Sequence, residues 1–169
     1  MRRQDREVTS LDEIMDIIGR CDTCRIALTE PDGVPYILPL SFGVERQGDR
    51  ITFYFHSALE GKKLELIKEG AVAAFELDTD HQLEYIAERG YCTFHYASVM
   101  GRGHLHILAD EEKHRALTFL MRQYHPDHEA WFNPAAMPRT LVYTLEVDQI
   151  TAKRKIPKGD HPAPTPPSD

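Results

Sequence analysis

Residues 24–56, "CRIALTEPDGVPYILPLSFGVERQGDRITFYFH", constrain the possible fold more strongly than any other part of the chain. Runs of β-branched and aromatic residues alternate here with two turn sequences, "PDG" and "RQGD". Strand-forming runs separated by such turns are typical of consecutive hairpins. The stretch therefore predicts a β-meander of three antiparallel strands.

The middle strand of this meander contains two prolines, Pro35 and Pro39. Proline has no backbone N–H and cannot donate a hydrogen bond to a neighbouring strand. We therefore expect this strand to be irregular, or to have a free edge at these two positions.

The rest of the chain mixes further strand patterns with helical spacing of apolar residues. A capping box, "SLDE" from Ser10 to Glu13, predicts the start of a first helix, and Asp110 can cap a later one. The helices are expected at residues 11–20, 59–68 and 111–125, and the remaining strands at 71–77, 91–110 and 140–155. Residues 91–110 are expected to form either one long strand or two strands interrupted near Gly101 to Gly103. Residues 81–90 are ambiguous between a loop and a short helical piece.

Six or seven strands with two or three helices, connected mostly by hairpins, predict a mainly β protein: an antiparallel barrel with peripheral helices. Residues 1–155 are expected to form a single domain. Residues 156–169, "IPKGDHPAPTPPSD", are polar and rich in proline, and predict a disordered tail.

Charge and composition narrow the classes of partner. A net charge of -7 argues against nucleic-acid and anionic-membrane binding, because neither target attracts an acidic surface. We also expect no membrane span, since no apolar run is long enough, and we expect a cytoplasmic protein. Cys21 and Cys24 form a CxxC pair, but Cys92 is the only other thiol, so reduced thiols are favoured over a metal or redox site.

The segment "FHSALEGKKLELI" changes from a strand pattern to a helix pattern and places Lys62 and Lys63 directly after Gly61. Lysines at a helix start oppose the helix dipole, which favours anions there. Ammonium groups and free backbone N–H groups together suit a phosphate. The segment is a candidate phosphate site; the alternative is that both lysines are ordinary solvated surface residues.

Histidines offer two further candidates. His56 ends the strand of residues 51–55 and is expected on the same face as Tyr54, where it can face a ligand or be an ordinary surface or core group. His104 and His106 share a strand face, as metal ligands could. His95 or His81 could supply a third ligand, but no recognisable spacing completes a set. We therefore expect exposed histidines and no metal site.

Four segments in order, "PYILPLSFG", "FHSALEGKKLELI", "YASVMGRG" and "LVYTLEVDQITAK", give the chain its family resemblance. From about residue 8 to residue 155 the chain resembles the pyridoxamine 5'-phosphate oxidase-like superfamily, and within it the nitroimidazole-resistance-protein branch. The resemblance implies a homodimer of split β-barrels that binds FMN at the subunit interface.

The resemblance also implies roles for individual residues. Lys62 and Lys63 would bind the FMN phosphate with help from Ser57, and His56 would lie beside the flavin. The remaining expected contacts are a strand whose backbone runs beside the isoalloxazine ring and a later strand from the other subunit. These are Leu38, Pro39, Leu40 and Ser41 for the first strand, and Ser98, Val99 and Met100 for the second.

The sequence departs from the family pattern at two places. Ala97 in "YASVM" replaces a common arginine, and Ile150 begins the segment that replaces a common "WSGK". The missing tryptophan removes an aromatic wall from the substrate pocket. Residues for the oxidase's own substrate phosphate are not matched, so vitamin B6 oxidation is not expected.

The resulting hypothesis is an FMN-dependent oxidoreductase. Electrons from NADH or NADPH would pass through FMN to a small acceptor, such as a nitroaromatic or a quinone, and His56 would orient the acceptor or donate a proton. The alternative is a non-catalytic protein of the same fold that holds FMN, haem or a deazaflavin.

Overall fold

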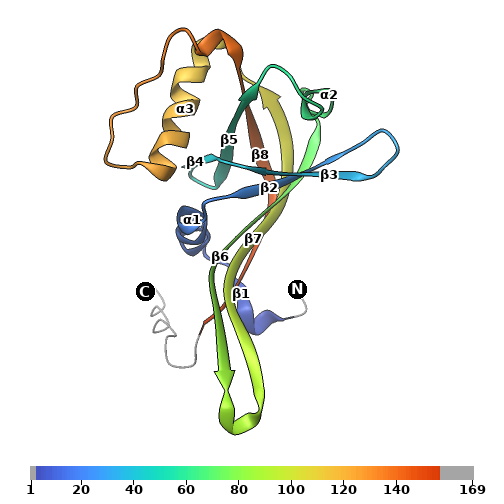
Figure 1. Ribbon diagram of the computed structural model, residues 1–169, viewed down its shortest axis with the longest axis vertical. Helices are drawn as coiled ribbons and strands as arrows, with labels where there is room; N and C mark the ends of the chain where they lie inside the picture. Colours follow the sequence, from blue (N-terminus) through green and yellow to red (C-terminus); the bar gives the residue numbers. More distant parts are fainter. Residues whose placement is uncertain (1–2, 157–169) are drawn as a thin grey trace.

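Eight strands form one antiparallel sheet in the computed structural model, which describes residues 3–156 (Figure 1). The order across the sheet is β3-β2-β6-β7-β8-β5-β4, and β1 pairs with β8. The strands are β1 (Glu7–Val8), β2 (Cys24–Thr29), β3 (Pro35–Leu40), β4 (Gly43–Gln47), β5 (Arg50–Ala58), β6 (Val72–Ile86), β7 (Tyr91–Ile107) and β8 (Thr140–Lys155). The predicted mainly β fold with antiparallel pairing is confirmed. Relative to the six expected strand ranges, the two additional strands are β1, which has two residues, and β4, which is separate from β3.

The predicted three-stranded meander is wrong, because its middle strand divides into β3 and β4 at opposite ends of the sheet. The division falls at Phe42, whose side chain is fully buried and whose N–H donates to the Tyr124 hydroxyl at 3.0 Å. Gly43 then passes so close to the C-terminal half of α3 that a Cβ there would lie 2.3 Å from the Leu120 nitrogen. Tertiary packing at this junction therefore replaces the meander with two separate hairpins.

The prediction of a free edge at the two prolines is confirmed. β3 pairs only with β2, where Pro35 lies opposite Thr29 and Pro39 opposite Arg25. An edge strand tolerates proline because half of its backbone groups have no strand to bond to. The outer edge of β3 is thus open for other contacts.

Three α-helices flank the sheet: α1 (Leu11–Arg20), α2 (Lys63–Leu66) and α3 (Asp110–Tyr124). Short 3-10 turns lie at η1 (Gln4–Arg6), η2 (Ala87–Arg89) and η3 (Met137–Arg139). None of these described helices is long and apolar enough to cross a membrane.

The helix start predicted after Ser10 is confirmed, but its capping box does not form, and the prediction that Asp110 caps α3 is wrong. Ser10 precedes α1 but makes no side-chain cap bond; only its carbonyl accepts a bond, from the Ile14 N–H at 3.0 Å. Asp110 is the first residue of α3, and its carboxylate pairs with the Lys113 ammonium at 2.7 Å. The cap position belongs to Ala109, because its extended backbone directs its N–H to the Glu112 carboxylate.

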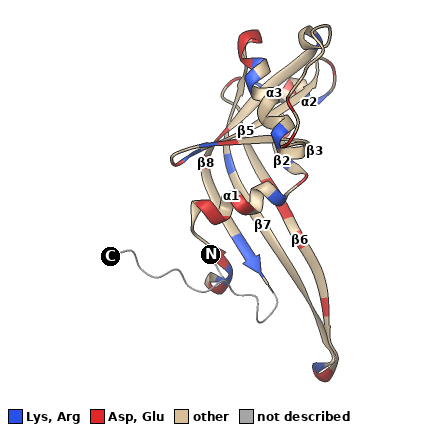
Figure 2. Ribbon diagram, turned by 90° about the vertical axis from the view of Figure 1, so that its left-hand side faces the viewer, with Lys and Arg blue, Asp and Glu red and all other residues tan. Residues whose placement is uncertain are grey.

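The ambiguous residues 81–90 belong mostly to a long hairpin arm. β6 continues to Ile86, and β7 runs without a break to Ile107, with a shift of register between Arg102 and Gly103. The arm extends beyond the body of the molecule, as Figures 1 and 2 show from two sides.

The main core lies inside the curled sheet. Phe53 on β5 and Phe75 on β6 have ring centroids 5.0 Å apart, although β7 and β8 separate their strands in the sheet order. Such contact requires the sheet to curve until its two halves face each other. A smaller apolar cluster beneath α3 contains Tyr54, Ala116 and Val142. The strands of this curved sheet position most of the candidate site residues, and α2 carries Lys63.

Candidate functional site

The end of β5 presents His56 on the outer face of the barrel. Phe53 and Phe55 are fully buried, while His56 is exposed and follows Tyr54 on the alternate face, as expected. Crowding by neighbouring protein atoms disfavours the charged imidazole and lowers the pKa of His56, and the nearby charge of Lys63 lowers it further. His56 is therefore mainly a neutral imidazole at pH 7.

Ser57 points to the opposite face. Its side chain is buried, and its hydroxyl donates to the carbonyl oxygen of Ala58 at 2.9 Å. The hydroxyl is thus satisfied within the chain and does not face the surface that His56 occupies.

The expected helix at residues 59–68 is wrong in length, since α2 contains only four residues. Gly61 and Gly70 have φ values of 126° and 73°, which a right-handed helix cannot include, so the chain turns at both positions. A helix of one turn has only a weak dipole, because few peptide units are aligned. Any attraction for an anion here must come mainly from the lysines themselves.

The two lysines differ in their surroundings. The Lys62 ammonium pairs with Glu30 at 2.9 Å and lies 4.9 Å from the centre of the Tyr36 ring. Hydrogen bonding to Glu30 raises the pKa of Lys62. Lys63 has no ion-pair partner among residues 3–156, and its charge acts on His56. Of the two, Lys63 is the cation available to a ligand.

β3 offers its backbone rather than its side chains. Leu38 and Leu40 pack against the main core, whereas Pro39 and the following Ser41 are exposed. The open edge of the strand can offer backbone groups to a flat ligand, and the backbone role expected for these residues stays a prediction.

On β7, the predicted residues also divide into buried and exposed ones. Ser98 and Val99 are buried, and Met100 is 45% exposed. Met100 lies in an apolar groove of about 310 Å³ together with Ala74 and Ile150. Ile150, which stands where the family often has tryptophan, thus shares a surface with a predicted cofactor contact.

The structure does not bring all the predicted residues together within one chain. His56 is paired with Val142 of β8, and Ser98 is paired with Lys153 of the same strand. These partners are eleven positions apart, which corresponds to about 35 Å along the strand. One chain supplies two separate half-sites: His56 and Lys63, with the start of β3 near Lys62 at Tyr36, in the first, and the groove at Met100 in the second.

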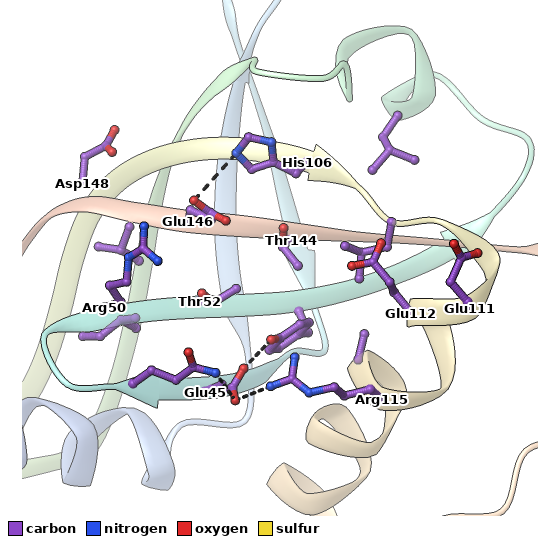
Figure 3. A pocket seen from close by; sticks show the side chains of 17 residues that line it. Glu45, Arg50, Thr52, His106, Glu111, Glu112, Arg115, Thr144, Glu146 and Asp148 are labelled. Carbon is purple, nitrogen blue, oxygen red and sulfur yellow. Dashed lines mark hydrogen bonds and ion pairs between the residues drawn. The ribbon is translucent and has the colours of Figure 1, made fainter.

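A larger pocket than this groove lies elsewhere, between the start of α3 and the outer face of the sheet (Figure 3). Its volume is about 710 Å³, and it contains none of the residues expected to bind the flavin, although His106, considered as a metal ligand, lies in it. Its lining includes Glu45, Arg50, Thr52, Tyr54, His106, Glu111, Glu112, Arg115, Thr144, Glu146 and Asp148. This second polar site was missed.

Glu45 is the most strongly bonded group of this pocket. Tyr54 donates its hydroxyl to the carboxylate at 2.6 Å, Gln47 donates at 2.8 Å and Arg115 at 2.5 Å. Burial alone would raise the pKa of Glu45, but these donors outweigh it and the pKa is lowered. Burial and the bond to Glu45 raise the pKa of Tyr54 to about 12.

Strand pairing explains why sequence reasoning missed the pocket. Thr52, Thr144 and His106 each have the alternating pattern of a strand, but they come from β5, β8 and β7. The pattern indicates which residues share a face within one strand; it does not indicate which strands are neighbours.

The histidines form separate pairs with carboxylates. His104 lies 2.9 Å from Asp148, His106 2.5 Å from Glu69 and His95 2.7 Å from Glu84. Within residues 3–156, no group of three histidines, cysteines or carboxylates is arranged to hold a metal ion.

The CxxC pair is inside the protein. Cys21 and Cys24 are both buried free thiols. Burial raises the pKa of Cys21 to about 12 and also raises that of Cys24. Neither sulfur is therefore a thiolate at neutral pH.

A curled antiparallel sheet with peripheral helices and an open edge strand defines a split-barrel protein. The sequence model of the pyridoxamine 5'-phosphate oxidase family matches residues 10–154, and the chain belongs to this family. The resemblance drawn from the four motifs is confirmed. Among curated proteins, no match to this chain is found.

Solved structures of similar fold come from several bacteria. A candidate 5-nitroimidazole antibiotic resistance protein from Bacteroides thetaiotaomicron has 29% identity and a TM-score of 0.74, covering 87% of this chain and 85% of that one. An FAD and haem binding protein from Mycobacterium smegmatis has 23% identity and a TM-score of 0.74, covering 88% and 73%. A flavocytochrome from Azotobacter vinelandii has 17% identity and a TM-score of 0.73, covering 93% and 72%.

Proposed function

We propose that this protein binds FMN between the two subunits of a homodimer and passes electrons from NADH or NADPH to a small acceptor, such as a nitroaromatic or a quinone. The observation that carries the proposal is the half-site of His56 and Lys63, at the junction of β5 and α2. Membership of the family supports it, as does the likeness to proteins whose names include flavin binding.

The residues present fit the phosphate end of FMN. Lys63 is a cation without a partner in the described chain, and a dianionic phosphate would supply one. Gly61 leaves room beside it, because a Cβ built on this glycine would meet no atom within 4 Å. Lys62 has Glu30 as a competing partner and Ser57 has a satisfied hydroxyl, so we assign the main contact to Lys63.

The ring end of the ligand requires a second copy of the chain. The open edge of β3 offers backbone groups, and the groove at Met100 and Ile150 offers an apolar wall. Because about 35 Å of strand separates the half-sites within one chain, a single flavin would meet both only if the groove came from a partner. This geometry supports a homodimer with shared sites.

When bound, FMN supplies the electron transfer, and the protein contributes binding, orientation and electrostatics. Neutral His56 can donate a hydrogen bond through one ring nitrogen and accept one through the other. We assign it the role of orienting the acceptor and exchanging a proton with it. Ile150 places an aliphatic side chain where the family commonly has an aromatic ring. The site therefore favours an acceptor molecule that presents a compact apolar face.

The test is a reaction followed by absorbance without oxygen. NADH or NADPH added to the flavin-loaded protein should bleach the flavin bands, and a nitroaromatic or quinone should restore them. Flavin that remains oxidised with both nicotinamides and with other two-electron donors would exclude the reductase function while leaving flavin binding intact.

A non-catalytic haem protein is the second candidate. Two structures of similar fold are named for haem or for a flavocytochrome, and exposed, neutral His56 has a nitrogen free to bind iron. A Soret band in the purified protein, lost on replacing His56 with alanine, would favour this function. A deazaflavin in place of FMN would be identified by mass spectrometry of the released cofactor.

A further inference from the structure

The floor of the polar pocket beside α3 is a grid of polar side chains from four adjacent strands. Thr52 of β5 lies opposite Glu45 of β4 on one side and opposite Glu146 of β8 on the other. Thr144 of β8 lies between Tyr54 of β5 and His106 of β7. Residues directly opposite in antiparallel strands share a face, so all these groups point outward together. α3 closes one side of the floor with Glu111, Glu112 and Arg115 (Figure 3).

Some carboxylates in the pocket already have hydrogen-bond or ion-pair partners within the protein. Glu45 accepts bonds from Tyr54, Gln47 and Arg115, and its charge is already paired with that of Arg115. Asp148 pairs with His104 at 2.9 Å, and Glu112 accepts the N–H of Ala109. These interactions stabilise the walls and are not available to a ligand.

Two groups at the centre of the floor have no hydrogen-bond partner among the described residues: Thr144, which is buried, and Glu146, whose side chain is 62% exposed to solvent. Thr144 is only 5% exposed, and its hydroxyl has no hydrogen-bond partner among the described residues although it lines the pocket. Glu146 lies beside it, with a carboxylate oxygen 4.0 Å from His106 Nε2, which is too far for a hydrogen bond. A hydroxyl and a carboxylate placed together in this way are both acceptors for an N–H donor.

The charges of the lining residues indicate whether a ligand of this pocket would be a cation or an anion. The pocket contains five carboxylates and two guanidinium groups, and one of these, Arg115, is neutralised by Glu45. Arg50, at the start of β5, is the remaining cation. A volume of about 710 Å³ lies in the range of small-molecule sites.

From this geometry we propose that the pocket between α3 and the β4-β5-β8-β7 face is a second binding site, for a small organic cation of the amine or guanidine class. Its N–H groups would donate to Glu146 and to the hydroxyls of Thr144 and Thr52. The site shares no residue with the proposed flavin site, so either can exist without the other.

The experiment titrates the full-length protein with cadaverine by calorimetry, and in parallel with pentanediol of the same chain length, in which hydroxyls replace the ammonium groups. Cadaverine should bind saturably with a dissociation constant of about 1 mM or lower, and pentanediol should not. Absence of saturable heat with cadaverine, or equal affinity for the diol, would overturn the proposal.

Single-residue variants test whether cadaverine binds in this pocket, because they should change its affinity in opposite directions. Glu146→Gln should weaken cadaverine binding at least about fivefold, since a charged acceptor is lost at a partly exposed position. Thr144→Val should weaken it as well, and Arg50→Gln should strengthen it by removing a repelling charge. Glu88→Gln makes the same chemical change at the tip of the arm and should have no effect.

An equal loss of cadaverine affinity in the two glutamate variants would contradict the proposal. If Glu146→Gln and Glu88→Gln reduce binding equally, cadaverine is responding only to the net acidity of the protein and the site does not exist. Flavin absorbance and far-ultraviolet circular dichroism of each variant confirm that folding and the separate flavin site are unchanged.

Discussion

At the scale of single residues, neighbours decide which polar groups are available to a ligand. Lys62 and Lys63 are adjacent in the sequence and look equivalent there, but Glu30 pairs with the first and leaves the second free. Glu30 is more than thirty positions earlier, so local sequence cannot distinguish the two lysines. The same applies to Ser57, whose hydroxyl bonds to Ala58.

The first prediction compares the two lysines. Lys63→Ala should weaken FMN binding by about tenfold or more, because a charge-assisted hydrogen bond to phosphate is lost. Lys62→Ala should have a smaller effect, since its ammonium already has a partner. Quenching of flavin fluorescence on binding measures both, with Lys68→Ala as the control. Equal losses for both variants would show that only overall charge matters.

The second prediction concerns pH and Tyr54. The pKa of Tyr54 is raised from 10.0 to about 12 in the folded protein, so folding favours the protonated phenol. Its contribution to stability is complete below pH 10 and is lost as the pH rises toward 12. Urea unfolding should show Tyr54→Phe less stable than the wild type near pH 8, by about 1 kcal/mol. This difference should narrow above pH 10; a constant difference would contradict the account.

At the scale of elements, periodicity and turn residues identify most of the fold. β8 was expected at residues 140–155 and is Thr140–Lys155, and α1 has the expected bounds. The errors fall where distant packing overrides the local pattern: Phe42 divides the expected meander because Tyr124 holds its backbone. α2 is shorter than expected because Gly61 with its positive φ precedes it and the extended backbone of Ile67 ends it. The polar pocket could not be foreseen, since its residues meet only through strand pairing.

The third prediction tests the β7–β8 contact at the register shift. A Cβ on Gly103 would lie 1.9 Å from the carbonyl oxygen of Glu146, so Gly103→Ala should destabilise the protein by about 1–3 kcal/mol. Gly19 lies within α1 with no atom within 4 Å of a built Cβ. Gly19→Ala should instead stabilise by roughly 0.5–1 kcal/mol. Urea unfolding at one pH gives both values, and the same sign for both variants would be evidence against this packing.

At the scale of the whole molecule, the main feature is an apolar surface on the hairpin arm that the rest of the described chain does not cover. The hairpin arm carries Leu83 and Tyr85 on β6 with exposures of 66% and 70%, and Phe94 lies opposite Leu83 on β7 at 49%. Three exposed apolar side chains on one face of an arm are typical of an interaction surface. Together with the separated half-sites, this surface favours the proposed homodimer.

The fourth prediction follows from that arrangement. The wild type should sediment as a dimer, and Leu83→Asp combined with Phe94→Asp should shift it toward monomer. Because each flavin site would need both subunits, FMN affinity should fall together with dimerisation. A double variant that remains dimeric and binds FMN normally would show that the arm is not part of the interface.

The central claim is that the chain holds a flavin where β5 passes into α2. The most direct measurement is the absorption spectrum of the purified protein after saturation with FMN and removal of free ligand, followed by identification of the released cofactor. We expect flavin bands, FMN as the released compound, and loss of the bands in Lys63→Ala. A colourless protein that takes up no FMN, or a spectrum with haem bands alone, would contradict the assignment.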